Sequence, residues 1–152
     1  MEDPNRPKEK ILGLLATQRL AVLATQGQGQ PYGSIVSFAS TPDGRQILFA
    51  TSRSTRKYEN LKADPRVALV IDNRSNRETD FQEAVAVTAT GRAEEVPDAE
   101  RAALLELYLD KHPYLADFVT APTCTLLRVR VETYYLVSRF QQVEELSVDR
   151  WS

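Results

Sequence analysis

The clearest constraint on the fold of this chain is a regular alternation of residue types near its C-terminal end. Leu127, Val129 and Val131 are separated by Arg128 and Arg130. Successive side chains of a strand point to opposite faces of a sheet, so this pattern predicts a half-buried antiparallel strand that continues toward position 137. We expect Arg128 and its charged neighbours on the solvent face of that strand.

Further segments of strand and helix length occur throughout the chain. The Asp43-Gly44 dipeptide between two β-like runs indicates a hairpin, and Gly91 stands where a long strand over residues 84–95 is expected to carry a bulge. Apolar residues at helical spacing predict helices over residues 7–18 and from residue 97 to about residue 111. The other expected strands cover residues 20–25, 47–51, 67–71 and about 140–146. Because closure removes exposed strand edges, six or more such strands predict a mainly β (α+β) fold, a small antiparallel barrel with flanking helices.

The segment from Phe49 to Val70 combines strand, turn and helix signals. The stretch from Phe49 to Thr51 closes an apolar run, and a polar turn follows it. A short helix then ends at Asp64-Pro65, because proline cannot continue a helix, and a β-branched run of strand length comes next. The segment therefore predicts a strand, a turn, a helix and a second strand in close succession.

Hydroxyl and cationic side chains gather where this helix begins. Ser54 and Thr55 stand directly before Arg56 and Lys57. A helix start presents unpaired backbone N–H groups and the positive end of the helix dipole, so cations there disfavour an isolated helix and favour a bound anion, most naturally a phosphate. The alternative is that Ser54 or Thr55 only caps the helix and that both cations are solvated.

The order of these signals resembles a known family. The turn TxxxSTRK, the helix YENL, the DP stop and the strand RVALVID, preceded by the strand QPYGSIVSF and its DG turn, are similar to the flavin-binding split-barrel proteins related to pyridoxamine 5'-phosphate oxidase. The resemblance extends over roughly residues 19–145. It implies a split barrel that binds FMN at the interface of a homodimer, with residues of both subunits around the cofactor.

The resemblance also assigns residues to the cofactor. Arg56 and Lys57 match the phosphate-binding pair of the family, and Arg139 matches an arginine that approaches the cofactor. The full candidate set, which includes the turn hydroxyls and the strand against which the ring lies, is Ser34, Ile35, Val36, Ser37, Thr51, Ser54, Thr55, Arg56, Lys57 and Arg139. No catalytic side chain is assigned, because a flavin itself carries the redox chemistry.

The chain departs from pyridoxamine 5'-phosphate oxidase itself at several positions. Ser34 and Ala39 stand where the oxidase carries basic residues, and the residues that recognise pyridoxal phosphate have no counterpart. We therefore expect an FMN-dependent oxidoreductase or flavin reductase of undefined substrate, with a small-molecule electron donor and acceptor, and not a true pyridoxamine phosphate oxidase.

Related split barrels also hold haem or deazaflavin, and both alternatives are open for this chain. Haem requires an axial ligand, for which His112 is the single histidine. Deazaflavin carries a longer acidic tail, for which Arg53, Arg74 and Arg77 are available. A family member without a cofactor, serving as an interaction domain, is the third alternative.

Length, charge and cysteine content set the broad class. The 152 residues, 42% of them hydrophobic, suffice for one domain over the whole chain, with residues 1–6 as a flexible N-terminal tail. The net charge of −2, from 21 acidic and 19 basic side chains, provides no general attraction to nucleic acid or to an anionic membrane. One histidine and the lone Cys124 supply neither a zinc site nor an internal disulfide. Without an apolar run of about eighteen residues or a signal-peptide core, we expect a cytoplasmic protein.

Overall fold

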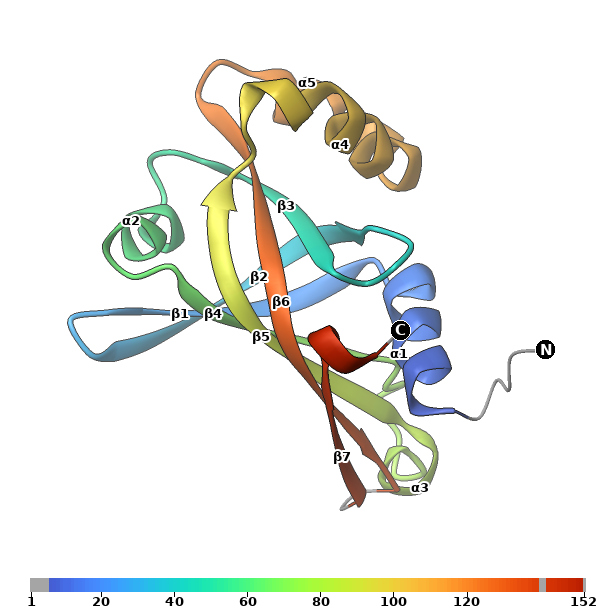
Figure 1. Ribbon diagram of the computed structural model, residues 1–152. Coiled ribbons are helices and arrows are strands. Elements are labelled where there is room, and N and C mark those ends of the chain that lie inside the picture. Colours follow the sequence, from blue (N-terminus) through green and yellow to red (C-terminus); the bar gives the residue numbers. More distant parts are fainter. Residues whose placement is uncertain (1–5, 140–141, 152) are drawn as a thin grey trace.

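The computed structural model describes residues 6–139 and 142–151, and an antiparallel sheet forms its framework (Figure 1). The strands are β1 (Leu20–Gly27), β2 (Gln30–Ser40), β3 (Gln46–Ser52), β4 (Arg66–Asp72), β5 (Val85–Glu95), β6 (Cys124–Ser138) and β7 (Gln142–Ser147). They follow the order β3-β2-β1-β4-β5-β6-β7, and β3 also pairs with β6. This additional pairing closes six strands into a barrel and leaves β7 attached to β6 alone. The expected mainly β split barrel is therefore confirmed.

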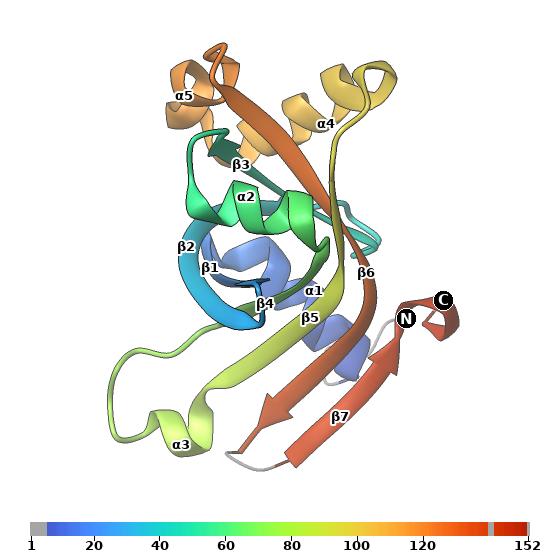
Figure 2. The same cartoon turned by 90° about the vertical axis from the view of Figure 1, so that its left-hand side faces the viewer.

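Helices flank the barrel on several sides. They are α1 (Pro7–Thr17), α2 (Arg56–Ala63), α3 (Asp80–Glu83), α4 (Asp98–Lys111) and α5 (Ala116–Thr120), with two 3-10 turns, η1 (Pro113–Leu115) and η2 (Val148–Arg150). α1 and α2 lie on opposite sides of the barrel strands, whereas α4 and α5 lie together beside β3 and one end of β6 (Figure 1, Figure 2). Among the described residues, no helix combines the length and the apolar character needed to cross a bilayer.

The element boundaries follow the sequence signals closely. α1 begins at Pro7, whose missing N–H would have no partner in a first turn, with Arg6 at the N-cap. α2 ends at Ala63, directly before Asp64-Pro65. The expected final strand is β7, although Phe140, its expected start, lies outside the described residues, as does most of the expected N-terminal tail.

Apolar residues pack in two clusters on the two sides of the sheet. Phe38 and Phe49, paired across β2 and β3, belong to the cluster inside the barrel, together with the buried face of α1. The next pair, Ala39 and Leu48, belongs to a second cluster outside the barrel, beneath α4 and α5. Because side chains alternate along a strand, β3 is buried on both faces, which explains its continuous apolar run.

Arg130 is exposed as expected, but Arg128 does not lie on a solvent face, and for Arg128 the expectation is wrong. Arg128 is only 2% exposed, because α4 covers this part of β6. Its Nε donates to Glu94 Oε1 (2.7 Å), and its Nη1 donates to Glu100 Oε1 on α4 (2.8 Å). Hydrogen bonds from Arg130 and Arg128 lower the pKa of Glu94, and the bond from Arg128 lowers the pKa of Glu100. The alternation separates the two faces correctly but carries no information about a helix from elsewhere covering one of them.

Gly91 lies at the bulge that the sequence predicts in β5. The register between β5 and β6 shifts between Thr90 and Gly91. A Cβ at Gly91 would overlap the backbone carbonyl group of Arg130 in the neighbouring strand. The position therefore accepts no side chain without movement of the backbone.

We predict that Gly91→Ala lowers the free energy of unfolding by about 3 kcal/mol, because two paired strands must separate locally to admit the methyl group. Gly13→Ala is the matched control. No atom lies within 4 Å of a Cβ at Gly13, and alanine at this exposed helical position should stabilise the fold by up to about 1 kcal/mol. Urea denaturation measures both variants, and equal stability would contradict the close strand approach at Gly91.

Candidate functional site

Strands β2 and β3 part from each other partway along their length. Their pairing runs from Ser40 opposite Ile47 to Phe38 opposite Phe49 and extends no further. Beyond that point β2 stays paired with β1 and β3 with β6, so β2 from Ser37 toward its start has one edge without a neighbouring strand among the described residues. α2 follows β3 and lies beside this opening (Figure 2). A free strand edge and a helix start therefore adjoin each other.

Side chains of β2 alternate between the barrel interior and its outer surface in the expected ring-binding segment. Ile35 is 69% exposed and Ser37 is partly exposed, whereas Val36 is 4% exposed and belongs to the core. Val36 is therefore available to a ligand through its backbone alone. Within the part of the chain that the structure describes, Ser34 Oγ is the one buried side-chain polar atom without a hydrogen-bond partner. An unpaired buried hydroxyl costs about 1–3 kcal/mol, so Ser34 suits a polar group that the chain itself does not supply.

Hydroxyl groups organise the turn between β3 and α2. Thr55 is the N-cap of α2, and its Oγ1 accepts a hydrogen bond from the backbone N–H of Tyr58 (3.3 Å). Thr51 is 2% exposed, and its Oγ1 lies 3.0 Å from Thr55 Oγ1. The hydroxyls of Ser52 and Ser54 lie 2.9 Å apart. The capping role is thus observed for Thr55, and the turn hydroxyls fix one another in place.

Arg56 and Lys57 occupy the first turn of α2. Across residues 6–139 and 142–151, neither side chain forms an ion pair and neither backbone N–H donates a hydrogen bond. Arg53 differs, because its guanidinium turns back to the carbonyl oxygens of Pro122 (3.1 Å) and Cys124 (3.3 Å). The helix start therefore presents two cations and two N–H groups that no described residue engages, a combination that favours a bound anion.

Arg139 lies far from this helix start. β6 begins at Cys124, which is paired with Ser52 next to the turn, and its other end precedes Arg139. At about 3.3 Å per residue, a strand of 15 residues spans roughly 45 Å. A single protomer therefore does not bring Arg139 together with the cations of α2.

Two side chains near the end of α4 hold β2 where it leaves β3. Tyr108 Oη donates a hydrogen bond to Ser37 O (3.0 Å), and His112 Nε2 lies 2.7 Å from Phe38 O. His112 is 0% exposed, and its Nδ1 lies 3.1 Å from Tyr114 Oη. Burial lowers the pKa of His112, so the neutral ring donates from Nε2 and accepts the Tyr114 hydroxyl proton at Nδ1. The sequence carries no signal for this positioning role, because only the fold brings α4 to β2.

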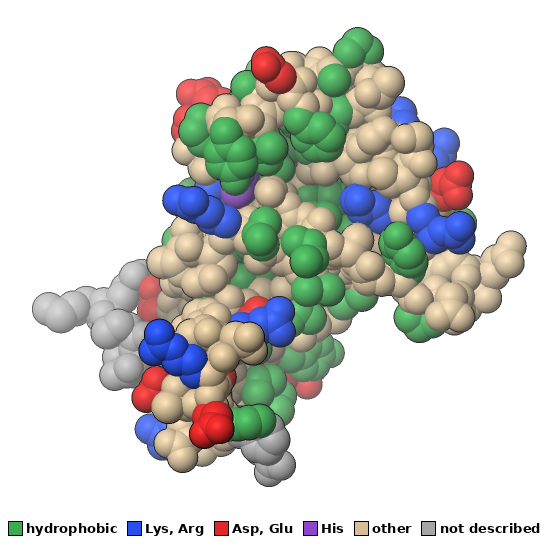
Figure 3. Space-filling model, turned by 180° about the vertical axis from the view of Figure 1, so that it is seen from behind, with side chains coloured by type: hydrophobic (Ala, Val, Ile, Leu, Met, Phe, Trp, Pro, Cys, Tyr) green, Lys and Arg blue, Asp and Glu red, His purple; other side chains and the backbone are tan. Residues whose placement is uncertain are grey.

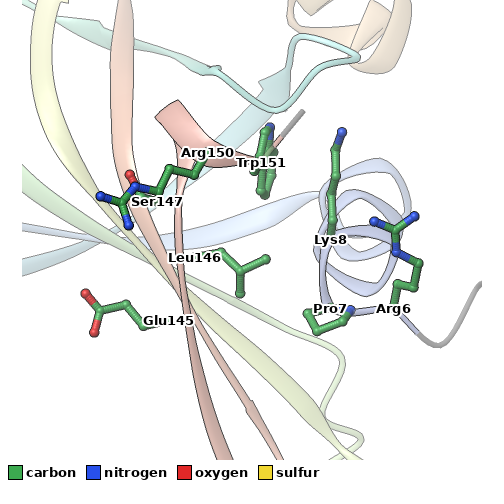
Figure 4. A pocket seen from close by; sticks show the side chains of 8 residues that line it. All are labelled: Arg6, Pro7, Lys8, Glu145, Leu146, Ser147, Arg150 and Trp151. Atoms are coloured by element: carbon green, nitrogen blue, oxygen red, sulfur yellow. The ribbon is translucent and has the colours of Figure 1, made fainter.

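Two cavities lie away from the helix start. One, of about 520 Å³, is bounded by the beginning of α1 and the end of β7 (Figure 4). Its cations, Arg6, Lys8 and Arg150, point in different directions and do not converge on one anion (Figure 4). The other, of about 660 Å³, adjoins the segment between β4 and β5 and includes Arg74 and Arg77. Of the three arginines considered for a deazaflavin tail, Arg74 and Arg77 therefore lie away from α2, and only Arg53 stands in the turn before it.

Comparison with known protein families gives a match over most of the chain. A family model described as pyridoxamine 5'-phosphate oxidase matches residues 7–138. The chain belongs to this family. All the candidate cofactor residues except Arg139 fall within the matched region, and membership agrees with the split barrel and with the order of the motifs along it.

Individual proteins similar to this chain act on or bind different groups. The chain is 33% identical over 110 residues to the non-canonical heme oxygenase HOZ, chloroplastic, of Arabidopsis thaliana, a match that covers 70% of this chain and 33% of that protein. A heme binding protein from Mycobacterium smegmatis superposes with a TM-score of 0.84 at 22% identity, over 95% of this chain and 60% of its own. A FAD-binding protein from Mesorhizobium loti superposes with a TM-score of 0.67 at 19% identity, over 84% of this chain and 91% of its own. The chain thus spans a third of the curated relative's length, and the two solved structures show a shared fold alone.

We predict that His112 makes the fold less stable as the pH falls below about 6.5. Its pKa is lowered in the folded state, so the unfolded chain binds more protons in this range and the free energy of unfolding decreases toward acid. The slope for one proton approaches about 1.4 kcal/mol per pH unit. Urea denaturation between pH 5.5 and 7.5 measures it, with His112→Gln as the non-titrating comparison. Equal slopes for both proteins would contradict a buried neutral imidazole.

Proposed function

We propose that this protein binds FMN and acts as an oxidoreductase or flavin reductase on small-molecule electron donors and acceptors. The observation that carries the proposal is the start of α2, where Arg56, Lys57 and two backbone N–H groups without a partner among the described residues adjoin the free edge of β2. A phosphate monoester offers the charged acceptor oxygens that these donors lack. Family membership supports the assignment, because the motifs that resemble the flavin site lie at this place.

The remaining parts of the site fit the rest of FMN. The polar edge of a flavin ring carries donors and acceptors, which the unpaired backbone of β2 can bind. Ser34 Oγ offers a buried hydroxyl that no described residue engages, and the side chain of Ile35, on the outer face of β2, offers an exposed apolar surface. When bound, FMN supplies the redox chemistry by accepting and returning an electron pair. The residues of the chain bind and orient the cofactor, and no side chain is assigned as an acid or a base.

We further propose that the working unit is a homodimer with the cofactor at the subunit interface. Arg139 belongs to the expected cofactor set but lies roughly the length of β6 from α2 of the same protomer. A second copy of the chain packed beside α2 can supply this arginine. Light scattering with simultaneous flavin absorbance should show a dimer with one FMN per chain, and a monomer at full FMN occupancy would contradict the shared site.

The Arg56→Ala/Lys57→Ala variant tests the phosphate site. A charge-assisted bond to phosphate is worth about 1.5–3 kcal/mol, so each substitution should weaken FMN binding by about one to two decades. Titration with FMN, followed by quenching of flavin fluorescence, measures this. Lys62→Ala/Arg92→Ala is the matched control, because it removes two exposed cations, one in the last turn of α2 and one on β5, and leaves the start of α2 unchanged. Failure of the unaltered protein to take up FMN, or unchanged affinity of the first variant, would refute the proposal.

Ser34→Ala separates ligand binding from folding in the same titration. Removing a buried hydroxyl without a partner should leave the free energy of unfolding unchanged or raise it by up to about 1 kcal/mol. FMN affinity should fall about two- to tenfold, since a hydrogen bond contributes about 0.5–1.5 kcal/mol. Lower stability of the FMN-free variant would mean that the hydroxyl serves the fold and not the ligand.

Haem binding is the second candidate, because the Arabidopsis thaliana relative is a heme oxygenase and the Mycobacterium smegmatis structure is of a heme binding protein. His112 is poorly placed as the axial ligand, since it is fully buried and both its ring nitrogens are hydrogen-bonded. Titration with haemin distinguishes the candidates. A Soret band in a protein that does not quench FMN would replace the flavin proposal. Its loss in His112→Ala would show that the imidazole leaves its two partners to bind iron.

A further inference from the structure

A row of apolar side chains crosses the outer face of the barrel. In the register of the sheet, Ile35 of β2 lies opposite Val22 of β1, which lies opposite Val70 of β4. Ile35 is 69% exposed, Val70 is 37% exposed, and Leu20 at the start of β1 is 55% exposed. Figure 3 shows hydrophobic side chains gathered on this face of the molecule, with lysine and arginine side chains near its margins. Large apolar side chains exposed next to one another indicate a binding surface.

A cavity of about 390 Å³ lies over this row. Its volume falls within the range of small-molecule sites. The apolar part of its lining includes Leu20, Ile35 and Val70, and its charged part consists of Arg19, Asp72 and Arg74. The cavity therefore combines an apolar floor with a charged rim, which suits a small molecule that is apolar over most of its surface and charged at one end.

The two arginines of the rim differ in how their charge is balanced. Arg74 Nε lies 3.1 Å from Asp72 Oδ2, so this pair is close to neutral. Arg19 is exposed and forms no ion pair with any of the described residues. Burial and the charge of Arg19 lower the pKa of Lys111 to about 8, as expected where a positive charge is not compensated. A guanidinium without a counter-charge, such as that of Arg19, suits a carboxylate, which it binds through two parallel hydrogen bonds.

Arg19 also lies next to the strand that is expected to carry the flavin ring. Its carbonyl oxygen accepts a hydrogen bond from the backbone N–H of Phe38 (3.2 Å), and the following residue, Leu20, is paired with Ser37. The backbone of Arg19 is therefore fixed against β2 near the point where β2 and β3 part. Because Ile35 belongs both to the cavity and to the ring-binding segment, a molecule in the cavity would lie beside the cofactor.

We propose that this cavity binds the second substrate of the flavin site, a small apolar molecule with one carboxylate that pairs with Arg19. Its role as a substrate rests on the proposed FMN function, whereas its binding needs no cofactor. The apolar row contacts the body of the molecule, and Arg19 determines which end faces the rim. A neutral molecule of the same shape contacts the same floor but leaves the guanidinium without a counter-charge.

2-Naphthoate and its uncharged analogue 2-naphthamide test this proposal, because they share size and shape and differ in charge. Isothermal titration calorimetry on the purified protein should show that naphthoate binds about five- to tenfold more tightly. Arg19→Gln should remove this preference and leave the binding of naphthamide unchanged. Arg92→Gln, which removes an exposed cation on β5, should retain the preference, and Leu20→Ser should weaken the binding of both compounds.

Several outcomes would overturn the proposal. They are equal binding of the two compounds, binding of neither, and persistence of the preference in Arg19→Gln. Loss of the preference in Arg74→Gln in place of Arg19→Gln would assign the carboxylate to the other side of the rim and would also refute it. FMN binding is measured separately with Arg56→Ala/Lys57→Ala, so failure of one proposal is distinguishable from failure of the other.

Discussion

The pairing of β3 with β6 is the contact on which the rest of the structure depends. β3 is paired with β6 from Gln46 to Ser52, but with β2 only opposite the segment from Phe38 to Ser40. β3 pairs with β6 through one edge and with β2 through the other, so the strand that closes the barrel also borders the opening beside β2. Closure satisfies the backbone groups of six strands, while the edge of β2 from Ser37 toward the start of the strand is left for another partner. α2 stands beside this edge, so a ligand suits the position better than a further strand.

Polar groups outside the barrel fix the geometry of this opening. The second apolar cluster places α4 over the outer face of β3 and β6, and Arg128 joins the helix to β5 through Glu100 and Glu94. Removing one partner of such a buried charge is strongly destabilising, so the position of α4 is tightly constrained. From this position Tyr108 and His112 form hydrogen bonds with the carbonyl groups of Ser37 and Phe38, where β2 and β3 part. The outer layer therefore stabilises the barrel and also sets the position of the strand that is expected to meet the cofactor.

Features that depend on local pattern could be predicted from the sequence, and features that depend on distant packing could not. The Asp43-Gly44 hairpin, the helix end before Pro65 and the bulge at Gly91 each follow from the conformational limits of one or two residues. The start of α2 could be predicted for the same reason. The burial of Arg128 could not, because alternation distinguishes two faces without showing what covers them. The unpartnered hydroxyl of Ser34 could not either, since a residue type does not reveal whether a partner lies within reach.

The distribution of charge along β2 indicates that this region selects ligands by the position of their anionic groups. The cations of α2 adjoin the free edge of the strand, and Arg19 lies near Ser37, where β2 and β3 part. Ser34 and Ser37 are about 10 Å apart along the strand, and the side chains between them are apolar. Ala39 packs beneath α4, so this position contributes no charge to the opening. A ligand or pair of ligands with anionic groups at the two ends of an apolar body finds a counter-charge at each end. A charge at the centre of that body would lose water without gaining a partner, which is unfavourable.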